Sequence, residues 1–172
     1  IQIKNAIESR SIIQCTYNKK DRTVYPLKIL NLEGYWYLIV YEPKDDLVKT
    51  FHLNSVKNIE HTDDIYTFNQ DIVDSFDNAI TAYFKPNNEP VRVELYIDKE
   101  VSRFFERKPL NKTQRPLRVL PDKSLELEVY VTDLMEIIPT IQRFIPYVVV
   151  IEPEELKIEI VKNLEVYSKY YE

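Results

Sequence analysis

Short apolar runs separated by polar turns dominate the first part of the chain. Five runs have the alternation or the β-branched and aromatic content that is typical of strands. They cover residues 11–17, 23–30, 35–41, 47–53 and 56–62. The central run, YWYLIVY, is apolar at almost every position, which predicts a strand buried on both faces. Five short strands in so short a stretch predict a small β-barrel of the SH3 or Sm type.

Helical spacing flanks this β-rich stretch on both sides. Ile3, Ala6 and Ile7 follow an i, i+3, i+4 pattern, which predicts a short first helix. Residues 68–88 return to that spacing, which predicts a helical linker. The segment PNNEP at 86–90 breaks the chain with two prolines and two asparagines, so a domain boundary is predicted there.

The remaining residues alternate between strand and helix patterns. Strands are predicted at 91–97, 115–120, 125–131 and 147–151, the last of them buried. Helices are predicted after Asp98, after Asp133 and after Pro153, with Glu136 completing a capping box and Pro139 splitting the second helix. The order β-α-β-β-α-β with one more helix predicts a ferredoxin-like domain.

The predicted fold class is therefore α+β, in three parts. A small SH3/Sm-like β-barrel covers residues 1–67, a helical linker covers 68–88, and a ferredoxin-like βαββαβ domain with an extra C-terminal helix covers 89–172.

Composition excludes several classes of enzyme. Gly34 is the single glycine of the sequence, so no glycine-rich phosphate loop and no nucleophile elbow are present. Two histidines and one cysteine are too few for a Cys/His zinc site. We therefore expect no catalytic residues, no metal and no cofactor.

Charge and cysteine content restrict partners and location. The net charge is −5, and residues 89–172 are net acidic, which argues against unaided DNA binding because phosphate contacts require cations. No apolar run approaches the roughly 20 residues that cross a bilayer, so no membrane partner is expected. The lone Cys15 fits a reducing compartment, which predicts a cytoplasmic protein.

Several short motifs occur in a fixed order along the chain. They are Tyr17, Pro26-Leu27-Lys28-Ile29, Gly34, Trp36-Tyr37-Leu38, Phe51-His52-Leu53-Asn54-Ser55-Val56 and, near the end, Pro153-Glu154-Glu155-Leu156. In this order they resemble the WYL domain followed by its C-terminal extension. The resemblance implies the ligand-sensing part of a bacterial transcriptional regulator that dimerises. It also implies that DNA is bound by a winged helix-turn-helix preceding this sequence.

The same resemblance implies that the effector is a nucleotide or a single-stranded nucleic acid. The candidate ligand-binding residues are Tyr17, Arg22, Tyr37, Lys49, His52, Ser55 and Lys57. The cations would contact phosphate, and the tyrosines would offer a stacking face. Ser55 stands where the family usually has an arginine, so weaker binding is expected, and Ser55→Arg is expected to tighten it.

Purely structural interpretations of the same residues remain open. The W-Y-L motif and Tyr17 also fit strand packing, and the cations also fit solvated turns and strand edges. Two alternative functions remain as well: a purely structural dimerisation module without a ligand, and a stand-alone Sm-like accessory protein that binds nucleic acid.

Overall fold

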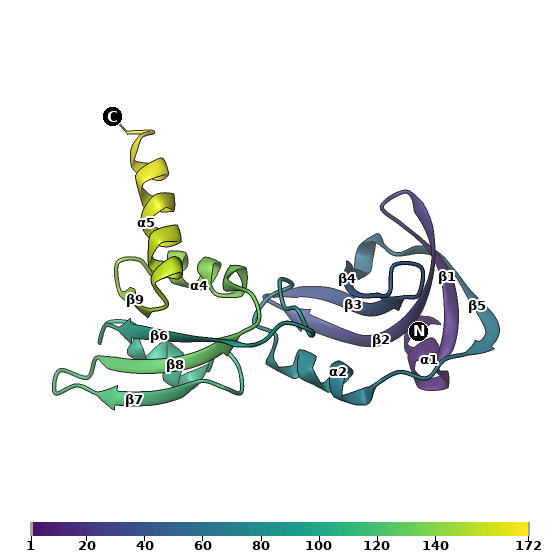
Figure 1. The fold of residues 1–172 in the computed structure, drawn as a ribbon, viewed down its shortest axis with the longest axis horizontal. Helices are drawn as coiled ribbons and strands as arrows, with labels where there is room; N and C mark the ends of the chain where they lie inside the picture. Colours follow the sequence, from purple (N-terminus) through teal and green to yellow (C-terminus); the bar gives the residue numbers. More distant parts are fainter. Residues whose placement is uncertain (1, 172) are drawn as a thin grey trace. The chain divides into compact units, whose positions relative to one another are not determined.

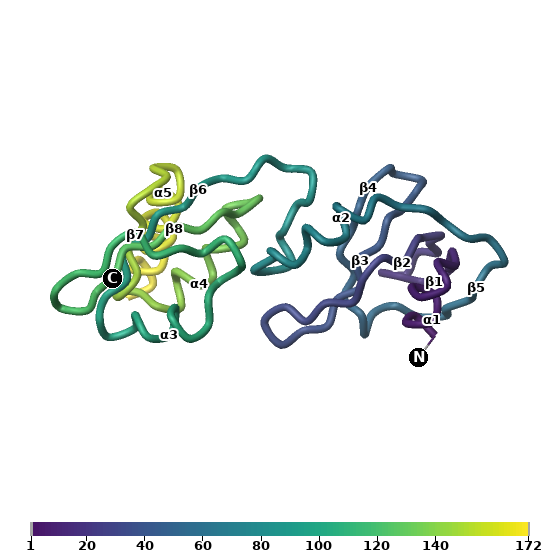
Figure 2. Tube along the Cα trace, turned by 90° about the horizontal axis from the view of Figure 1, so that it is seen from below, coloured from purple at the N-terminus to yellow at the C-terminus, as the bar shows by residue number. Residues whose placement is uncertain are grey.

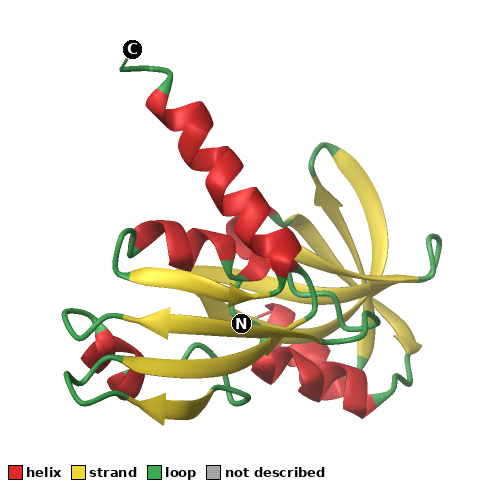
Figure 3. Ribbon diagram, turned by 60° about the vertical axis from the view of Figure 1, so that its left-hand side comes forward, coloured by secondary structure: helices red, strands yellow, loops and turns green. Residues whose placement is uncertain are grey.

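The structure is a computed structural model that describes residues 2–171. The chain forms two compact units, residues 1–76 and residues 77–172. Each unit combines one antiparallel sheet with helices, which confirms the predicted α+β class (Figures 1 and 3). Within residues 2–171, none of the helices has both the length and the apolar character required to cross a bilayer.

The first unit is built on a five-stranded sheet in the order β4-β3-β2-β1-β5. Its elements are α1 (Gln2–Ser9), β1 (Ser11–Tyr17), β2 (Lys20–Leu32), β3 (Tyr35–Glu42), β4 (Leu47–His52), a 3₁₀ helix (Leu53–Ser55), β5 (Lys57–Ile65) and α2 (Gln70–Ser75). All five predicted strands are present. Between the described residues no strand pairing joins β4 to β5, because β5 pairs with β1 at the opposite edge. The predicted closed barrel is therefore not confirmed.

One face of this sheet forms a core with α1. Alternate positions of β3 point into it, and Leu38 and Val40 are fully buried beside Phe51 of β4. Ala6 of α1 is also fully buried, as its helical spacing predicted. Trp36, which shares the strand phase of Leu38, lies near the β2–β3 turn and is 52% exposed. Burial on both faces therefore holds for the middle of β3 and not for its start.

Aromatic side chains attach the segment after β5 to the same sheet. The ring of Tyr66 stacks on Tyr25 at 4.9 Å, and its hydroxyl donates to the carbonyl of Pro26. Phe68 contacts the ring of Tyr41 at 5.1 Å. The predicted linker helix over 68–88 is wrong in extent, because α2 has only six residues and is followed by a 3₁₀ helix at Phe76–Asn78.

The second unit is built on a four-stranded sheet in the order β7-β8-β6-β9. Its elements are β6 (Val91–Ile97), α3 (Ser102–Arg107), β7 (Arg115–Val119), β8 (Leu125–Val131), a 3₁₀ helix (Leu134–Glu136), α4 (Ile138–Arg143), β9 (Val148–Glu152) and α5 (Glu154–Ser168). The predicted order of strands and helices is present, and the trace in Figure 2 follows it. The ferredoxin-like assignment stays a prediction.

Details of this unit depart from the sequence-based expectations. Pro139 lies in the first turn of α4 and separates it from the preceding 3₁₀ helix, as predicted. Asp133 accepts from the Met135 amide, but Glu136 does not complete the capping box, because it is fully buried and binds other donors. Val149 of β9 is 50% exposed, because β9 is an edge strand covered on one face only.

Residues 77–90 belong to the second unit rather than to a free linker. The Glu136 carboxylate accepts from the Ile80 amide at 3.1 Å and from both the amide and the hydroxyl of Thr132 at 2.8 Å. The Thr132 hydroxyl also accepts from the Lys85 amide at 2.7 Å, and Ile80 packs against the core of the second unit. These bonds explain why the units divide after residue 76, before the predicted boundary at 86–90.

A comparison of two fragments tests this boundary. A fragment of residues 77–172 is expected to be more stable than one of residues 89–172, because the shorter fragment loses Ile80, which packs against the core of this unit and whose amide donates to Glu136. Loss of a fully buried aliphatic side chain costs roughly 1.5–3 kcal/mol, and loss of a partly buried one costs less. Urea unfolding followed by circular dichroism measures the difference. Equal midpoints would contradict the assignment of residues 77–88 to the second unit.

Candidate functional site

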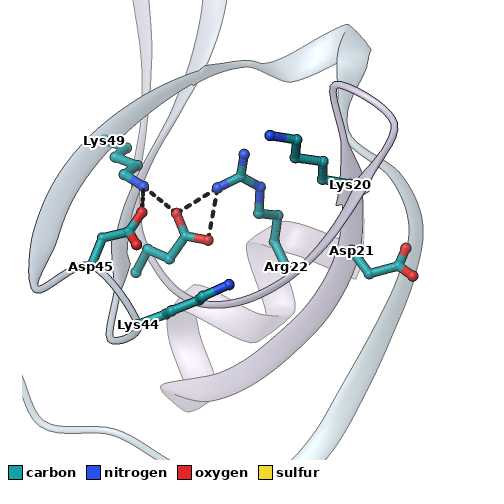
Figure 4. Close-up of a pocket in the computed structure, with 7 residues that line it drawn as sticks. Lys20, Asp21, Arg22, Lys44, Asp45 and Lys49 are labelled. Atoms are coloured by element: carbon teal, nitrogen blue, oxygen red, sulfur yellow. Dashed lines mark hydrogen bonds and ion pairs between the residues drawn. The ribbon is translucent and has the colours of Figure 1, made fainter.

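A polar pocket of about 590 Å³ lies in the first unit (Figure 4). Its lining residues are Lys20, Asp21, Arg22, Glu42, Lys44, Asp45 and Lys49. They come from the start of β2, the end of β3, the following turn and the middle of β4. Four cationic and three anionic side chains therefore meet in one place, in a chain that is net acidic as a whole.

Strand alternation explains why these side chains converge. Glu42 follows Leu38 and Val40 at two-residue steps, so it shares the inward face of β3 with these core residues. Arg22 has the same phase as the buried Val24 on β2, and Lys49 the same phase as the buried Phe51 on β4. The pocket therefore lies where the inward face of the sheet changes from apolar to charged residues.

Glu42 is the centre of the pocket. Its side chain is only 3% exposed and accepts from Arg22 Nη1 through both oxygens, at 2.9 and 2.8 Å. Lys49 donates to Glu42 and also to Asp45 in the adjoining turn, as Figure 4 shows. Burial of a carboxylate is costly without partners, and two cations provide them here.

Part of the cationic surface is not used by these ion pairs. Nε of Arg22 is buried without a hydrogen-bond partner, although Nη1 serves both oxygens of Glu42. The side chains of Lys20 and Lys44 make no ion pair or hydrogen bond with the other described residues. Arginine commonly binds oxyanions through two nitrogens, so its unused edge is suited to a second anion.

The ion pairs shift the protonation equilibria of the pocket. Burial disfavours the charged form of Glu42, but hydrogen bonds from Lys49 and Arg22 outweigh it and hold the pKa of Glu42 below its ordinary value of 4.5. The hydrogen bond from Lys49 likewise lowers the pKa of Asp45. Both carboxylates are therefore ionised at neutral pH.

The structure gathers two of the seven predicted ligand-binding residues, Arg22 and Lys49, into the pocket. Tyr17, Tyr37, His52, Ser55 and Lys57 do not line it. Ser55 lies in the 3₁₀ helix after β4, and Lys57 begins β5; both are exposed. This pocket therefore does not bring all seven predicted residues together.

The aromatic candidates form a separate cluster around His52. Tyr17 stacks on Phe51 at 3.9 Å, and its hydroxyl accepts from the His52 amide at 3.2 Å. Tyr35 and Tyr37 contact the His52 ring at 5.9 and 5.5 Å. One face of the Tyr17 ring is thus occupied by Phe51 and is not open for stacking.

Sequence reasoning missed five of the residues that line the pocket: Lys20, Asp21, Glu42, Lys44 and Asp45. Glu42 and Asp45 stand beside a polar turn, where charged residues are usually solvated. The signal that could have identified Glu42 is its phase, since it continues the inward series of Leu38 and Val40. Among residues 2–171, no group of histidine, cysteine and acidic side chains could hold a metal ion.

The fold and the pocket define a two-unit α+β protein with a cation-rich pocket, in which a buried carboxylate pairs with two of the cations. Residues 1–61 match the WYL domain, and residues 89–166 match the WCX domain. The two matches together cover most of the chain, and the chain belongs to the WYL-domain regulator family.

Two solved structures are similar to the chain. Proteasome accessory factor B/C (PafBC) of Arthrobacter aurescens is 22% identical, with a TM-score of 0.38 over 92% of this chain and 25% of that one. A protein described as CRISPR Cas-related is 13% identical, with a TM-score of 0.55 over 99% of this chain and 51% of that one. The second likeness supports the fold alone. The chain spans about a quarter and about half of these proteins. No curated protein matches it.

The ion-pair network predicts the effect of removing its central carboxylate. Glu42→Ala is expected to lower the free energy of unfolding of the first unit by about 2–3 kcal/mol, less than the roughly 3–5 kcal/mol of fully buried pairs. The reduction is smaller because Arg22 and Lys49 keep 20% and 24% of their side-chain exposure and remain partly hydrated. Urea unfolding of variant and wild-type protein at pH 7 measures it.

The difference in unfolding free energy between wild type and Glu42→Ala is also expected to depend on pH. Because the pKa of Glu42 is lowered by folding, its stabilising contribution is complete above its ordinary value of 4.5 and is lost as the pH falls through the lowered value. The difference between wild type and Glu42→Ala should therefore shrink in acid. A difference that stayed constant down to about pH 2 would exclude the ion pairs as its source.

Proposed function

We propose that this chain is the sensory part of a WYL-type transcriptional regulator and that it binds an anionic effector in the pocket around Arg22. The observation that carries the proposal is the unused cationic capacity of the pocket: the unpartnered Arg22 Nε and the unpaired Lys20 and Lys44. The effector class is a nucleotide or a single-stranded nucleic acid, whose phosphates match these donors.

Charge distribution supports an anionic ligand. The pocket collects four of the nine basic side chains of residues 1–67 in one polar cavity, while the whole chain carries a net charge of −5. A concave cationic site in an acidic protein concentrates the electrostatic field at one place and leaves the remaining surface repulsive to nucleic acid. Binding would therefore be confined to a small part of the molecule.

The pocket chemistry favours recognition over catalysis. Glu42 and Asp45 are held ionised by hydrogen bonds from Arg22 and Lys49, so they neutralise charge and are poorly suited to exchange protons near neutral pH. We therefore propose a non-catalytic regulatory domain. We also propose that it is cytoplasmic. Binding would act on a DNA reader outside this sequence only if the effector had different affinities for two states of the regulator.

Pyrophosphate binding tests the pocket. Arg22→Ala and Lys49→Ala are each expected to weaken pyrophosphate binding roughly tenfold or more, because a hydrogen bond to a charged group contributes about 1.5–3 kcal/mol. Lys57→Ala is the matched control, since Lys57 is an exposed cation of the same unit outside the pocket. Isothermal titration calorimetry at fixed ionic strength compares these three variants with the wild-type chain.

Equal affinity of all four proteins would place the anion site elsewhere. Binding lost in Lys57→Ala and retained in Arg22→Ala would move the site to β5. The expectation that Ser55→Arg tightens binding is tested in the same titration. A gain there would bring the 3₁₀ helix after β4 into the binding surface.

A second candidate function, self-association, is favoured by α5. Its stripe at Leu156 and Ile160 is buried, but the same stripe continues into exposed Leu164 and Tyr167, 41% and 62% accessible. Figures 1 and 3 show the C-terminal half of α5 projecting away from the sheet of its own unit. An exposed apolar helix of this kind marks a protein contact.

The stripe fits a second copy of the chain. In an antiparallel pair of α5 helices with the two-fold axis near Tyr167, the exposed Leu164 and Tyr167 of one copy would pack against the same residues of the other. A two-fold contact repeats itself, so each copy would cover the stripe of its partner. We propose that α5 supplies the dimer contact of the regulator.

A charge placed within the exposed stripe tests this contact, because a dimer would have to bury that charge without a partner. Tyr167→Glu should abolish the dimer at micromolar concentration, whereas Ile158→Glu, on another face of α5, should not. Analytical ultracentrifugation measures the dissociation constants, and a monomeric wild-type chain would contradict the proposal.

A further inference from the structure

We infer that Glu42 is an internal anion that occupies the place of the effector's charged group and must be displaced when the effector binds. The inference rests on the proposed anion-binding function of the pocket and concerns how that function is controlled. Its basis is that the carboxylate already engages the two cations, Arg22 and Lys49, that lie deepest in the pocket.

A carboxylate and a phosphate compete for the same donors. Glu42 presents both oxygens to Arg22 Nη1 and one of them to Lys49, an arrangement that a phosphate oxygen could reproduce. Since these donors cannot fully serve two anions, the apparent affinity for an effector is reduced to the fraction of molecules in which Glu42 has left.

Several features make Glu42 displaceable. It is the last residue of β3, directly before the turn that contains Asp45. Its bond to Arg22 uses a single guanidinium nitrogen, and the buried Nε is left without an acceptor. Figure 4 shows Lys20 and Lys44 on either side of Arg22, where they can face an incoming anion while Glu42 is released.

This competition selects the class of effector. A singly charged carboxylate would replace Glu42 like for like and gain little. A dianion or a polyphosphate gains the unused Arg22 Nε and at least one unpaired lysine in addition to the donors of Glu42. The pocket is therefore selective for phosphorylated ligands with two or more negative charges, such as the diphosphate group of a nucleotide.

Pyrophosphate titration of the whole chain tests the competition. Glu42→Gln is expected to bind pyrophosphate about 10- to 100-fold more tightly than wild type, as for an internal competitor that is engaged about 90–99% of the time. Asp21→Asn is the matched control: it removes the same charge from the pocket lining, but Asp21 is bonded to Thr16 and points away from Arg22 (Figure 4). Its affinity should change less than about threefold.

Each other outcome overturns the inference in a recognisable way. Equal gains in Glu42→Gln and Asp21→Asn would show that only net charge matters. Weaker binding by Glu42→Gln would show that Glu42 positions Arg22 and Lys49 instead of competing for them. If Arg22→Ala lowers affinity and Glu42→Gln does not raise it, the inference fails while the anion site stands; if neither matters, the site itself fails.

Two further measurements keep the test decisive. Glu42→Asp retains the charge with a shorter reach, and an intermediate gain in affinity is expected for it. If the Glu42→Gln chain does not fold, the titration of Glu42→Asp takes its place. Acetate at the same ionic strength should compete poorly with pyrophosphate in wild type. Equal binding of acetate and pyrophosphate would contradict the selectivity for multiply charged ligands.

Discussion

A buried carboxylate on the inward face of β3 is the interaction on which the first unit depends. Glu42 is 3% exposed, and the cost of dehydrating its charge is offset by Arg22 from β2 and Lys49 from β4. Three neighbouring strands are therefore joined at one end by charge and in the middle by the apolar core. Apolar residues of similar size commonly stabilise a protein as well as such ion pairs do. Stability alone therefore does not account for a charged set in which Arg22 Nε is left without an acceptor, and the proposed anion binding does.

The second unit contains a buried glutamate of a different kind. Glu136 is fully buried, but its oxygens accept from two amides and one hydroxyl, and no cation is bonded to it within the described residues. Its bonds join Ile80, at the start of the unit, to the turn after β8. Every donor is neutral and satisfied, so this carboxylate is suited to fixing the chain and offers nothing to an anion. The contrast shows that burial alone does not indicate a ligand site; incompletely used donors do.

The local sequence pattern was sufficient to predict the helices and strands, but not whether the first sheet closes into a barrel. Two-residue alternation predicted the strands of both sheets, and Pro139 predicted a split helix, because both effects act within a few residues. The linker was mispredicted because Ile80 and Lys85 donate to Glu136 and Thr132, which are distant in sequence. Prediction of the site residues had the same limit. Arg22 and Lys49 could be proposed from charge, whereas the strand phase that brings Glu42 between them, and keeps Ser55 and Lys57 out, depends on the register of the sheet.

The W-Y-L motif contributes to the pocket through that register. None of its three residues lines the pocket: Trp36 is half exposed, Tyr37 contacts His52, and Leu38 lies in the core. Leu38 nevertheless fixes which face of β3 is inward, and Glu42 stands four residues later on the same face. A slip of one residue between β3 and its neighbours would turn Glu42 outward, remove the partner of Arg22 and leave Lys49 with Asp45 alone. The motif thus specifies the pocket indirectly, by fixing the phase of the strand that carries its central charge.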